Sequence, residues 1–497
     1  MQPADVAIIG AGASGTAIFS ELVHSFQIER LDRLSIVIID RDLRRGHGRV
    51  YGPDHPWLLM NTPAHALSIR SWDGADFMRW LLARGGHRGE EPVEHAHVSR
   101  ALYGEYLRER FHDLLDSPPP GLEVEVVDDW VERLTPHESG SRLRLSSGRA
   151  LEARKTVLAT GPNRPEDVYG LTGTPGYVEH PYPASARLRG IPRDSPVVIL
   201  GSSLSAVDVA LTLHHTGHRA PVHMVSRRGL LPEVKAEYTV QQEIYNEASG
   251  ADGENAGKPA SLESALAVFQ RFLSSHRNTA ESNQGDPVQQ FAESVRQAKH
   301  PTDGNFAQRY SAHLGMDQVW PQLDEEELLA FMRTQYAPLL HKNAAIPLIN
   351  ARKLLALLRA DRLRVHGGLH TIRPGEEGGF RLSFRGGADL TVDHVINAMG
   401  PSKYLVSPGS RNLYAHLLHE GQLRELPTGG ARVTFPGGNL LDRDGRPVPA
   451  LHAVGHPTSG SHPYINNIEL IVSNSAHVAR QICADLMRSR TVARNNT

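Results

Sequence analysis

The chain has 497 residues, enough for two or three domains with a large core. Its formal net charge is −2 at pH 7, so no overall field favours a nucleic acid or a membrane as partner. The one cysteine, Cys483, excludes a disulfide framework and a Cys-x-x-Cys redox pair, and it indicates a reducing, cytoplasmic setting. No apolar run reaches the roughly 20 residues of a membrane span, and we expect no signal peptide before Asp5.

The N-terminal stretch has the pattern of a nucleotide-binding βαβ unit. An apolar run at 6–9 leads into Gly10, Gly12 and Gly15, and apolar residues then recur at helical spacing. A second apolar run ends in Asp40, about 25 residues after Gly15, which is suitable for a contact with a ribose hydroxyl. The glycines allow a tight turn that brings a helix N-terminus to a pyrophosphate. The alternative is an empty Rossmann-like unit.

The region after this unit predicts the rest of a first domain, residues 1–165. The stretch 46–81 is rich in Gly, Pro, His and Trp and predicts a long ordered loop, and 98–111 predicts a helix. The stretch 150–165 predicts a strand that runs into Gly161. Such a strand and turn typically close the first nucleotide domain of two-dinucleotide flavoproteins.

A second βαβ unit is predicted from residue 196, within a domain at 190–400. "PVVILGSSLSAVDVALTL" has Gly201 at the first glycine position, but Ser203 and Ala206 at the other two. Both residues are small enough for close approach, and the Ser203 hydroxyl can also donate to a phosphate. The second strand ends in Ser226, Arg227 and Arg228 rather than in an acid, which favours the 2′-phosphate of NADPH. The alternative is a solvated basic turn.

The remaining sequence completes the predicted architecture. Residues 236–345 combine polar stretches with helical periodicity and predict a helical insertion in the second domain. Short strands follow up to about 400, and 401–497 returns to the first domain with a strand, a loop and a terminal helix. The predicted fold class is α/β, with two Rossmann-like dinucleotide-binding domains and a helical insertion.

Several motifs resemble the FAD-NAD(P)-binding flavoproteins of the two-dinucleotide-binding superfamily. The resemblance lies in "ILGSSLSAVDVALTL", in "SRRGLLP" and in three motifs of the first domain, and it is specific over roughly residues 5–235. The family is broad, and the chain is similar both to amine N-monooxygenases that convert aspartate to nitrosuccinate and to a urate hydroxylase-type branch. The first-domain motifs fall on Gly46, Gly48, Tyr51, Gly52, Asn61, Pro63, Ala64, Tyr103, Gly104, Tyr106 and Leu107.

The resemblance implies that the final loop and helix lie beside the flavin ring. A polar set occupies this part of the sequence, and a helix start there would aim N–H groups at the flavin carbonyl edge. For His462 and Asn467 the alternative is a turn and a helix N-cap. The polar set consists of His456, Ser459, Ser461, His462, Tyr464, Asn466 and Asn467.

Two nucleotide sites in one chain indicate electron flow from NADPH to FAD. Without a cysteine pair, O2 is the natural acceptor, and a flavin-hydroperoxide would pass one oxygen atom to a nucleophilic substrate. A base such as His65 or His462 could take the proton of an amine, with Asn466 nearby. Arg70 could bind a substrate carboxylate, with Arg45 and Arg49 as other candidates. We predict no metal site.

The predicted function is NADPH-consuming, FAD-dependent N-oxygenation of a small polar amine, with L-aspartate as first choice. The alternatives are urate hydroxylase-like C-oxygenation of a heterocycle and a redox-sensing protein that oxygenates nothing. We expect a small-molecule substrate and O2 as partners, neither nucleic acid nor membrane, and leave a homo-oligomer open. The predicted cofactor-binding residues are Gly10, Gly12, Ala13, Ser14, Gly15, Asp40, Arg41, Asn61, Thr62, Gly161, Gly201, Ser202, Ser203, Leu204, Ser205, Ser226, Arg227, Arg228, Gly455 and Asn467.

Overall fold

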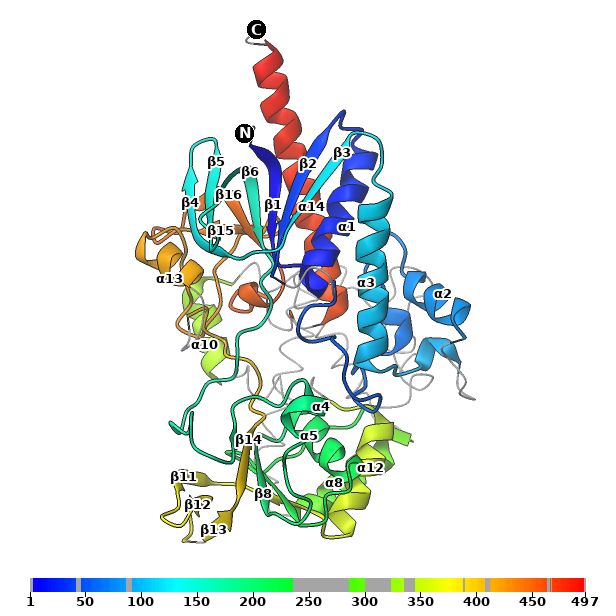
Figure 1. Cartoon of the computed structure of the whole chain (residues 1–497), viewed down its shortest axis with the longest axis vertical. Coiled ribbons are helices and arrows are strands. Elements are labelled where there is room, and N and C mark those ends of the chain that lie inside the picture. The colour runs from blue at the N-terminus through cyan, green and yellow to red at the C-terminus, as the bar shows by residue number, and fades with distance from the viewer. Residues whose placement is uncertain are drawn as a thin grey trace. The chain divides into compact units, whose positions relative to one another are not determined.

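The computed structural model describes residues 3–41, 46–85, 92–235, 286–299, 323–334, 345–387, 389–406, 412–462, 465 and 467–495. The chain divides into two compact units, one of Met1–Arg164 with Pro401–Thr497 and one of Pro165–Gly400 (Figure 1). Each unit contains parallel strands flanked by helices, so the predicted α/β class is confirmed. The predicted insertion at 236–345 lies largely outside the described residues.

The described part of the first unit contains an eight-stranded sheet. Its main order is β15-β16-β6-β1-β2-β3, and an antiparallel hairpin of β4 and β5 continues from β6. Strand β1 lies between β2 and β6 and is parallel to both. The strands are β1 Ala4–Ile9, β2 Leu34–Ile39, β3 Leu122–Val127, β4 Val131–His137, β5 Gly140–Leu145, β6 Ala150–Leu158, β15 Asn439–Leu441 and β16 Pro447–Ala453.

Helices cover this sheet because its strands are apolar on both faces. Residues of α1, α3 and α14 share a buried cluster with one face of β1 and β2, and α13 joins the cluster on the other face. Helices α1 and α14 lie side by side although more than 400 residues separate them (Figure 1). The helices of this unit are α1 Ala13–Ile28, η1 Ala64–Ala66, α2 Asp76–Ala83, η2 Val93–His95, α3 Arg100–Asp116, α13 Asn412–His419, η4 His456–Thr458 and α14 Ile468–Asn495.

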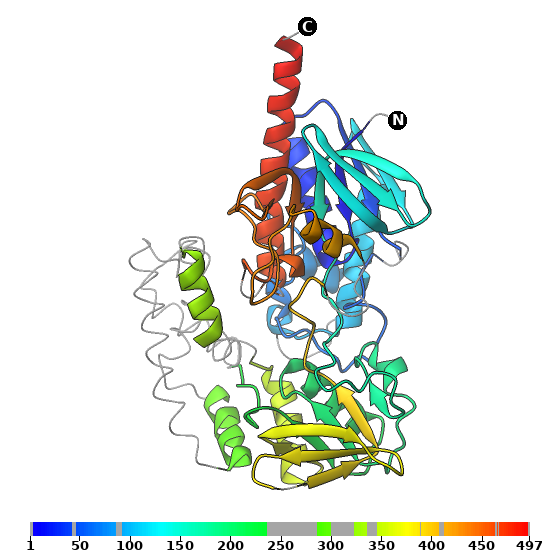
Figure 2. The same ribbon diagram turned by 90° about the vertical axis from the view of Figure 1, so that its left-hand side faces the viewer.

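The second unit contains a five-stranded parallel sheet of order β10-β9-β8-β14-β7 in its described residues. A second, antiparallel sheet of β11, β12 and β13 is seen in yellow in Figure 2. The strands are β7 Tyr177–Val178, β8 Val197–Leu200, β9 Val222–Val225, β10 Leu363–His366, β11 Leu369–Pro374, β12 Phe380–Phe384, β13 Asp389–Val392 and β14 His394–Asn397. The helices are α4 Ala184–Arg187, α5 Leu204–His215, α8 Pro287–Lys299, α10 Glu325–Thr334 and α12 Leu348–Arg359.

One predicted element differs from the structure. The stretch 46–81 was expected to be loop throughout, but its end folds into α2. Phe77, Trp80 and Leu81 recur there at helical spacing and are buried, so packing selects the helix. None of the helices in the described part of the chain combines the length and the apolar character that a membrane span requires.

Candidate functional site

The first glycine turn joins β1 to α1 in a conformation that only glycine adopts easily. Gly10 has φ +107°, and a Cβ on it would lie 2.4 Å from the carbonyl oxygen of Ala159 at the end of β6. A Cβ on Gly15 would lie 2.0 Å from the carbonyl oxygen of Gly10, so this glycine lets α1 pack directly on the strand. Both positions therefore have the geometry that a dinucleotide-binding turn requires.

Three glycines from distant segments surround the start of α1. A Cβ on Gly48 would lie 2.8 Å from Gly12 Cα, and a Cβ on Gly455 would lie 2.1 Å from the Oγ of Ser14. The helix begins at Ala13 without a side-chain cap. N–H groups at an uncapped N-terminus bind anions, and glycines leave room for the ligand. We call Gly12, Gly48 and Gly455 the cradle, and its shape and chemistry fit the diphosphate of FAD.

Asp40 and Arg41 follow β2 beside this turn. An Asp40 carboxylate oxygen accepts a hydrogen bond of 2.7 Å from the backbone N–H of Ala11, so the acid also fixes the turn. The guanidinium of Arg41 lies 4.1 Å from the ring centre of Trp130. Gly161 has φ +70° and follows Thr160, whose hydroxyl is 2.6 Å from that of Tyr414. The ribose and cofactor contacts of these residues stay predictions.

The second turn repeats the first almost bond for bond. Gly201 has φ +106° and donates to the carbonyl oxygen of Val225 at 2.8 Å, just as Gly10 donates to that of Ile39 at 2.9 Å. A Cβ on Gly201 would lie 2.8 Å from the carbonyl oxygen of Ala398, the counterpart of Ala159.

The helix starts also match. Ser203 precedes α5 with φ −97° and ψ −162°, and Gly12 precedes α1 with φ −76° and ψ −164°. Because this conformation is extended, serine adopts it as readily as glycine. The side chain of Ser203 makes no capping hydrogen bond, so α5 begins uncapped in the same way, with Ser202 before it and Leu204 and Ser205 in its first turn.

The arginine loop after β9 is held by β10. The N–H of Ser226 donates to the carbonyl oxygen of His366 at 3.0 Å, and the Oγ of Ser226 accepts from the N–H of Gly229. Arg227 and Arg228 are exposed. They therefore stand at the carboxyl end of a parallel strand, where ligands of doubly wound sheets bind.

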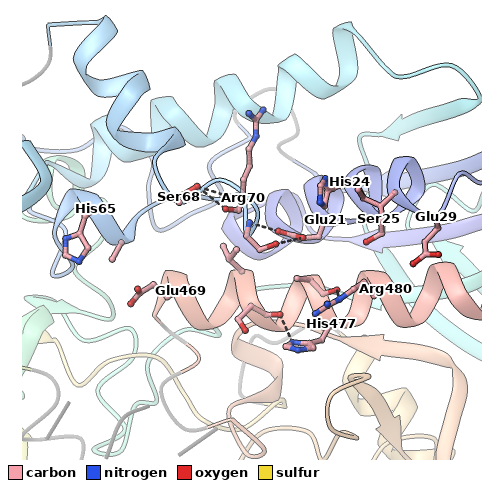
Figure 3. A pocket seen from close by; sticks show the side chains of 17 residues that line it. Glu21, His24, Ser25, Glu29, His65, Ser68, Arg70, Glu469, His477 and Arg480 are labelled. Carbon is pink, nitrogen blue, oxygen red and sulfur yellow. Dashed lines mark hydrogen bonds between the residues drawn. The ribbon is translucent and has the colours of Figure 1, made fainter. Parts of the chain in front are cut away.

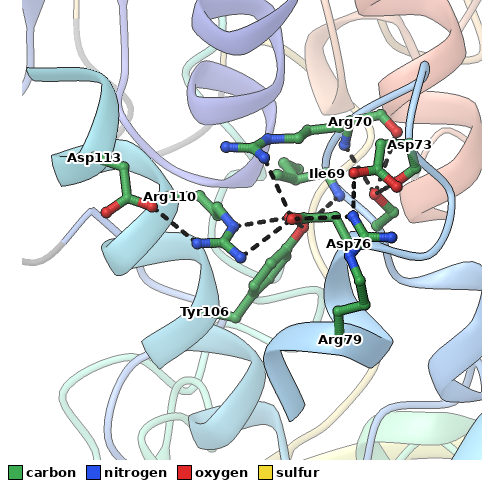
Figure 4. Close-up of polar contacts among 9 residues, drawn as sticks. Ile69, Arg70, Asp73, Asp76, Arg79, Tyr106, Arg110 and Asp113 are labelled. Atoms are coloured by element: carbon green, nitrogen blue, oxygen red, sulfur yellow. Dashed lines mark hydrogen bonds and ion pairs between the residues drawn. The ribbon is translucent and has the colours of Figure 1, made fainter. Parts of the chain in front are cut away.

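Arg70 makes an ion pair that was not predicted. Its guanidinium lies 3.3 Å from the Asp76 carboxylate, which also accepts two bonds from Arg110, at 2.8 and 3.1 Å (Figure 4). The hydroxyl of Tyr106 donates to Asp76 at 2.7 Å and accepts from the N–H of Ile69 at 3.0 Å. This network connects the segment before α2 to α3. It also engages the guanidinium of Arg70, which the sequence analysis proposed as the partner of a substrate carboxylate.

The environment of Asp76 favours its charged form. Burial by itself would raise the pKa of Asp76, but hydrogen bonds from Arg110 and Tyr106 and the charge of Arg70 outweigh it and hold the pKa below its ordinary value. Burial, followed by the negative charge of Asp76, raises the pKa of the Tyr106 hydroxyl, so this group stays protonated. The network is therefore ionic at neutral pH.

The remaining candidates lie in three places. His65, whose Nδ1 is 3.1 Å from the carbonyl oxygen of Glu94, lines a groove together with Arg70 (Figure 3). Asn61 and Thr62 are half-buried just before η1. Burial lowers the pKa of His462 to about 4, and its ring packs on Phe435 with centres 4.5 Å apart.

The start of α14 contains the last two candidates. The side-chain oxygen of Asn467 accepts from the N–H of Glu469 at 2.9 Å, so Asn467 caps the N-terminus of α14. This is the helix N-cap that the sequence offered as the alternative to a flavin contact. Asn466 lies outside the described residues. The sequence analysis assigned no site role to Asp76, Arg110 or the cradle glycine Gly48. Gly48 was named there only as part of a family motif.

Residues 7–163 match the family model described as FAD-NAD(P)-binding. The protein YdhS of Escherichia coli strain K12, named as uncharacterized, is 22% identical over 431 residues, which are 75% of this chain and 77% of that protein. An L-aspartate N-monooxygenase (nitrosuccinate-forming) of Streptomyces cremeus is 28% identical over 246 residues, 41% of this chain. This match spans only 36% of the Streptomyces protein.

Solved structures of flavin-dependent N-hydroxylating enzymes share the fold. The cadaverine monooxygenase DfoA of Erwinia amylovora, bound to FAD, has a TM-score of 0.61 at 14% identity and covers 97% of this chain and 95% of its own. The ornithine N-hydroxylase of Kutzneria sp. 744, with reduced FAD and NADP+, has a TM-score of 0.57 at 16% identity and covers 98% of this chain and 100% of its own. The predicted resemblance is confirmed: residues 7–163 form an FAD-NAD(P)-binding domain, and the chain has the fold of the flavin-dependent N-monooxygenases.

Proposed function

We propose that the protein is an FAD-dependent monooxygenase that consumes NADPH and oxygenates the nitrogen of a small polar amine. The observation that carries the proposal is the repetition of the Gly10 turn at Gly201, with equivalent hydrogen bonds and an uncapped helix start in each unit. Two such turns in one chain suit a flavin and a nicotinamide nucleotide. We assign FAD to residues 1–165 with 401–497, and NADPH to 190–400.

The single cysteine supports O2 as the electron acceptor. Cys483 is fully buried in the cluster between α1 and α14, and burial raises the pKa of its thiol to about 12. A thiol in this setting stays protonated at neutral pH and cannot serve as a nucleophilic thiolate relay. When bound, FAD would take electrons from NADPH and activate O2 so that one oxygen atom reaches the substrate.

The residues have separate tasks in this proposal. The cradle and the first N–H groups of α1 hold the FAD diphosphate, and Ser203, Arg227 and Arg228 hold the phosphates of NADPH. Burial lowers the pKa of His462 to about 4 and keeps its ring neutral at pH 7, so it is a weak base that would hydrogen-bond to the substrate rather than take the proton of an ammonium. We prefer Arg49 for a substrate carboxylate because Arg70 pairs with Asp76.

Arg49 is suited to this role by its position. Its guanidinium donates to the carbonyl oxygen of Pro162 at 2.7 Å, directly after the turn at Gly161. It follows the cradle residue Gly48 in the chain, so its backbone lies beside the predicted diphosphate. Arg45, the other candidate, lies outside the described residues.

L-Aspartate is the first substrate to test, because one relative is named as an L-aspartate N-monooxygenase. The FAD-loaded protein is incubated with NADPH and O2 and with a panel of amino acids, amines and urate. Hydroxylamine, nitroso or nitro products from an amine would support the proposal. Ring-oxidised products from urate, with amines yielding only peroxide, would replace it with C-oxygenation, and no substrate-dependent oxidation at all would favour a redox sensor.

A further inference from the structure

The carboxyl edge of the first sheet continues from Asp40 to the loop after β3. Strand β1 ends at the first glycine turn, β2 ends before Asp40, and its parallel neighbour β3 ends at Val127 (Figure 1). The backbone N–H of Asp40 donates to the carbonyl oxygen of Val127 at 3.2 Å, so the two strands end at the same level. A dinucleotide whose diphosphate lies in the cradle and whose ribose reaches Asp40 therefore directs its base toward the loop after β3.

This loop and the residue after Asp40 bring a guanidinium and an indole together. Arg41 Cζ lies over the ring of Trp130, 4.1 Å from the ring centre, which is the distance of a stacked cation–π contact. Trp130 is half-buried, whereas Arg41 is exposed. Arg41 directly follows Asp40, so the pair stands beside the predicted ribose contact. We call Arg41 and Trp130 the shelf.

The backbone of Trp130 is held by the turn between β5 and β6. Its N–H donates to the Asp129 carboxylate at 2.7 Å, and its carbonyl oxygen accepts from the N–H of Ser146 at 3.0 Å. The same carboxylate accepts from the N–H of Ser147 at 3.2 Å and from the hydroxyl of Ser146. Trp130 is therefore placed before a ligand binds, which lowers the entropic cost of a contact made through it.

A stacked guanidinium offers a planar surface to a nucleotide base. Arginine is planar and weakly hydrated, and bases stack on guanidinium planes as they do on aromatic rings. One face of the Arg41 guanidinium lies on Trp130, and because the side chain is exposed, the opposite face is accessible to a base. Lysine has the same charge but no such plane. The shape of the shelf, and not only its charge, therefore suits a base.

We propose that the shelf holds the adenine ring of FAD. The base stacks on the guanidinium of Arg41, and Trp130 positions that guanidinium from the other side. Together with the cradle and Asp40, the shelf makes the first unit select a flavin that has an adenosine. The proposal rests on the assignment of FAD to the first unit, and it is independent of the substrate that is oxygenated.

Binding of FAD and of FMN to the apoprotein tests the shelf, measured by quenching of flavin fluorescence. FMN contains the flavin, the ribityl chain and a phosphate but lacks the adenosine. We expect Arg41→Ala and Arg41→Lys to raise the Kd for FAD alike, by about 5- to 150-fold, which is the effect of losing one base stack. Lysine should not restore binding, because it retains the charge without the plane. The Kd for FMN should change by less than about twofold in both variants.

The positioning role of Trp130 is tested by two further variants. Trp130→Ala should also raise the Kd for FAD, and Trp130→Phe should return it to within about threefold of the wild type, because phenylalanine offers a ring face to the guanidinium. The Kd for FMN should stay constant in both. Arg33→Lys is the matched control, because Arg33 is exposed, directly precedes β2 at its opposite end and pairs with Glu123 at 3.3 Å. It should leave both Kd values unchanged.

The possible failures of the proposal differ from one another. The melting temperature of each apoprotein variant checks its fold. An FAD affinity of Arg41→Lys equal to that of the wild type overturns the stack, because the charge alone would then be sufficient. Equal losses of FAD and FMN affinity in folded variants overturn the adenine assignment. A wild-type protein without measurable FAD binding would overturn the FAD assignment itself, and the shelf with it.

Discussion

Gly12→Ala should weaken FAD binding while the fold is retained. The φ of Gly12 is −76°, and an added Cβ meets only Gly48 Cα, at 3.5 Å, which is ordinary van der Waals contact. Alanine at a helix N-cap costs the protein at most about 1–2 kcal/mol. The methyl group would instead occupy the cradle, where the diphosphate accepts from the first N–H groups of α1.

The expected loss follows from one displaced hydrogen bond. A hydrogen bond to a charged group is worth about 1.5–3 kcal/mol, so the Kd for FAD should rise about 10- to 150-fold. Flavin fluorescence quenching measures this Kd on the apoprotein, and circular dichroism checks the fold. Gly190→Ala, where no heavy atom lies within 4 Å of the new Cβ, is the matched control. A Kd for Gly12→Ala within threefold of the wild type would refute the cradle as the diphosphate site.

Other substitutions test separate parts of the account. Arg227→Ala should raise the KM for NADPH about ten- to a hundredfold while the KM for NADH changes little, because only NADPH has the 2′-phosphate; an equal rise for both would refute the assignment. Asp76→Asn should lower the free energy of unfolding by about 3–5 kcal/mol in urea titrations, because Arg110 and Arg70 lose their buried counter-charge. Since the folded-state pKa of Asp76 is depressed, its stabilisation is present above the unfolded pKa and lost as pH falls through the folded value; a difference in unfolding free energy between wild type and Asp76→Asn that stays constant down to about pH 2 would contradict this. Cys483→Ser should leave NADPH oxidation nearly intact but lower the melting temperature, because it places a hydroxyl in an apolar core; loss of flavin reduction in a folded variant would overturn the absence of a thiol relay.

Local patterns were sufficient to predict the conformation of the two glycine turns. Gly10 and Gly201 each end a buried strand and precede a helical pattern, so both turns follow from short-range signals. Serine can stand at position 203, where the motif has glycine, because the backbone before α5 is extended there and does not require glycine. The sequence also indicated the return of 401–497 to strand and helix, because apolar periodicity reappears at its end.

Contacts between distant segments could not be predicted in the same way. The pairing of Arg70 with Asp76 and Arg110 depends on the path of a loop and on the placement of α3, which no local pattern determines. The groove of Figure 3 depends on α14 packing beside α1, and its lining residues Glu21 and Arg480 are 459 positions apart in the sequence. The role of Asn467 as a helix cap, in contrast, follows from a local sequence pattern. Its contact with the flavin stays a prediction.

The central claim is that electrons from NADPH lead to oxygenation of an amine nitrogen. It is tested most directly by following NADPH, O2 and L-aspartate together in one reaction of the FAD-loaded protein, with mass spectrometry of the product. The account predicts that O2 and NADPH are consumed in step with aspartate and that 18O from 18O2 appears on its nitrogen. Consumption of NADPH that yields only hydrogen peroxide for every amine tested, with 18O entering urate instead, would contradict it.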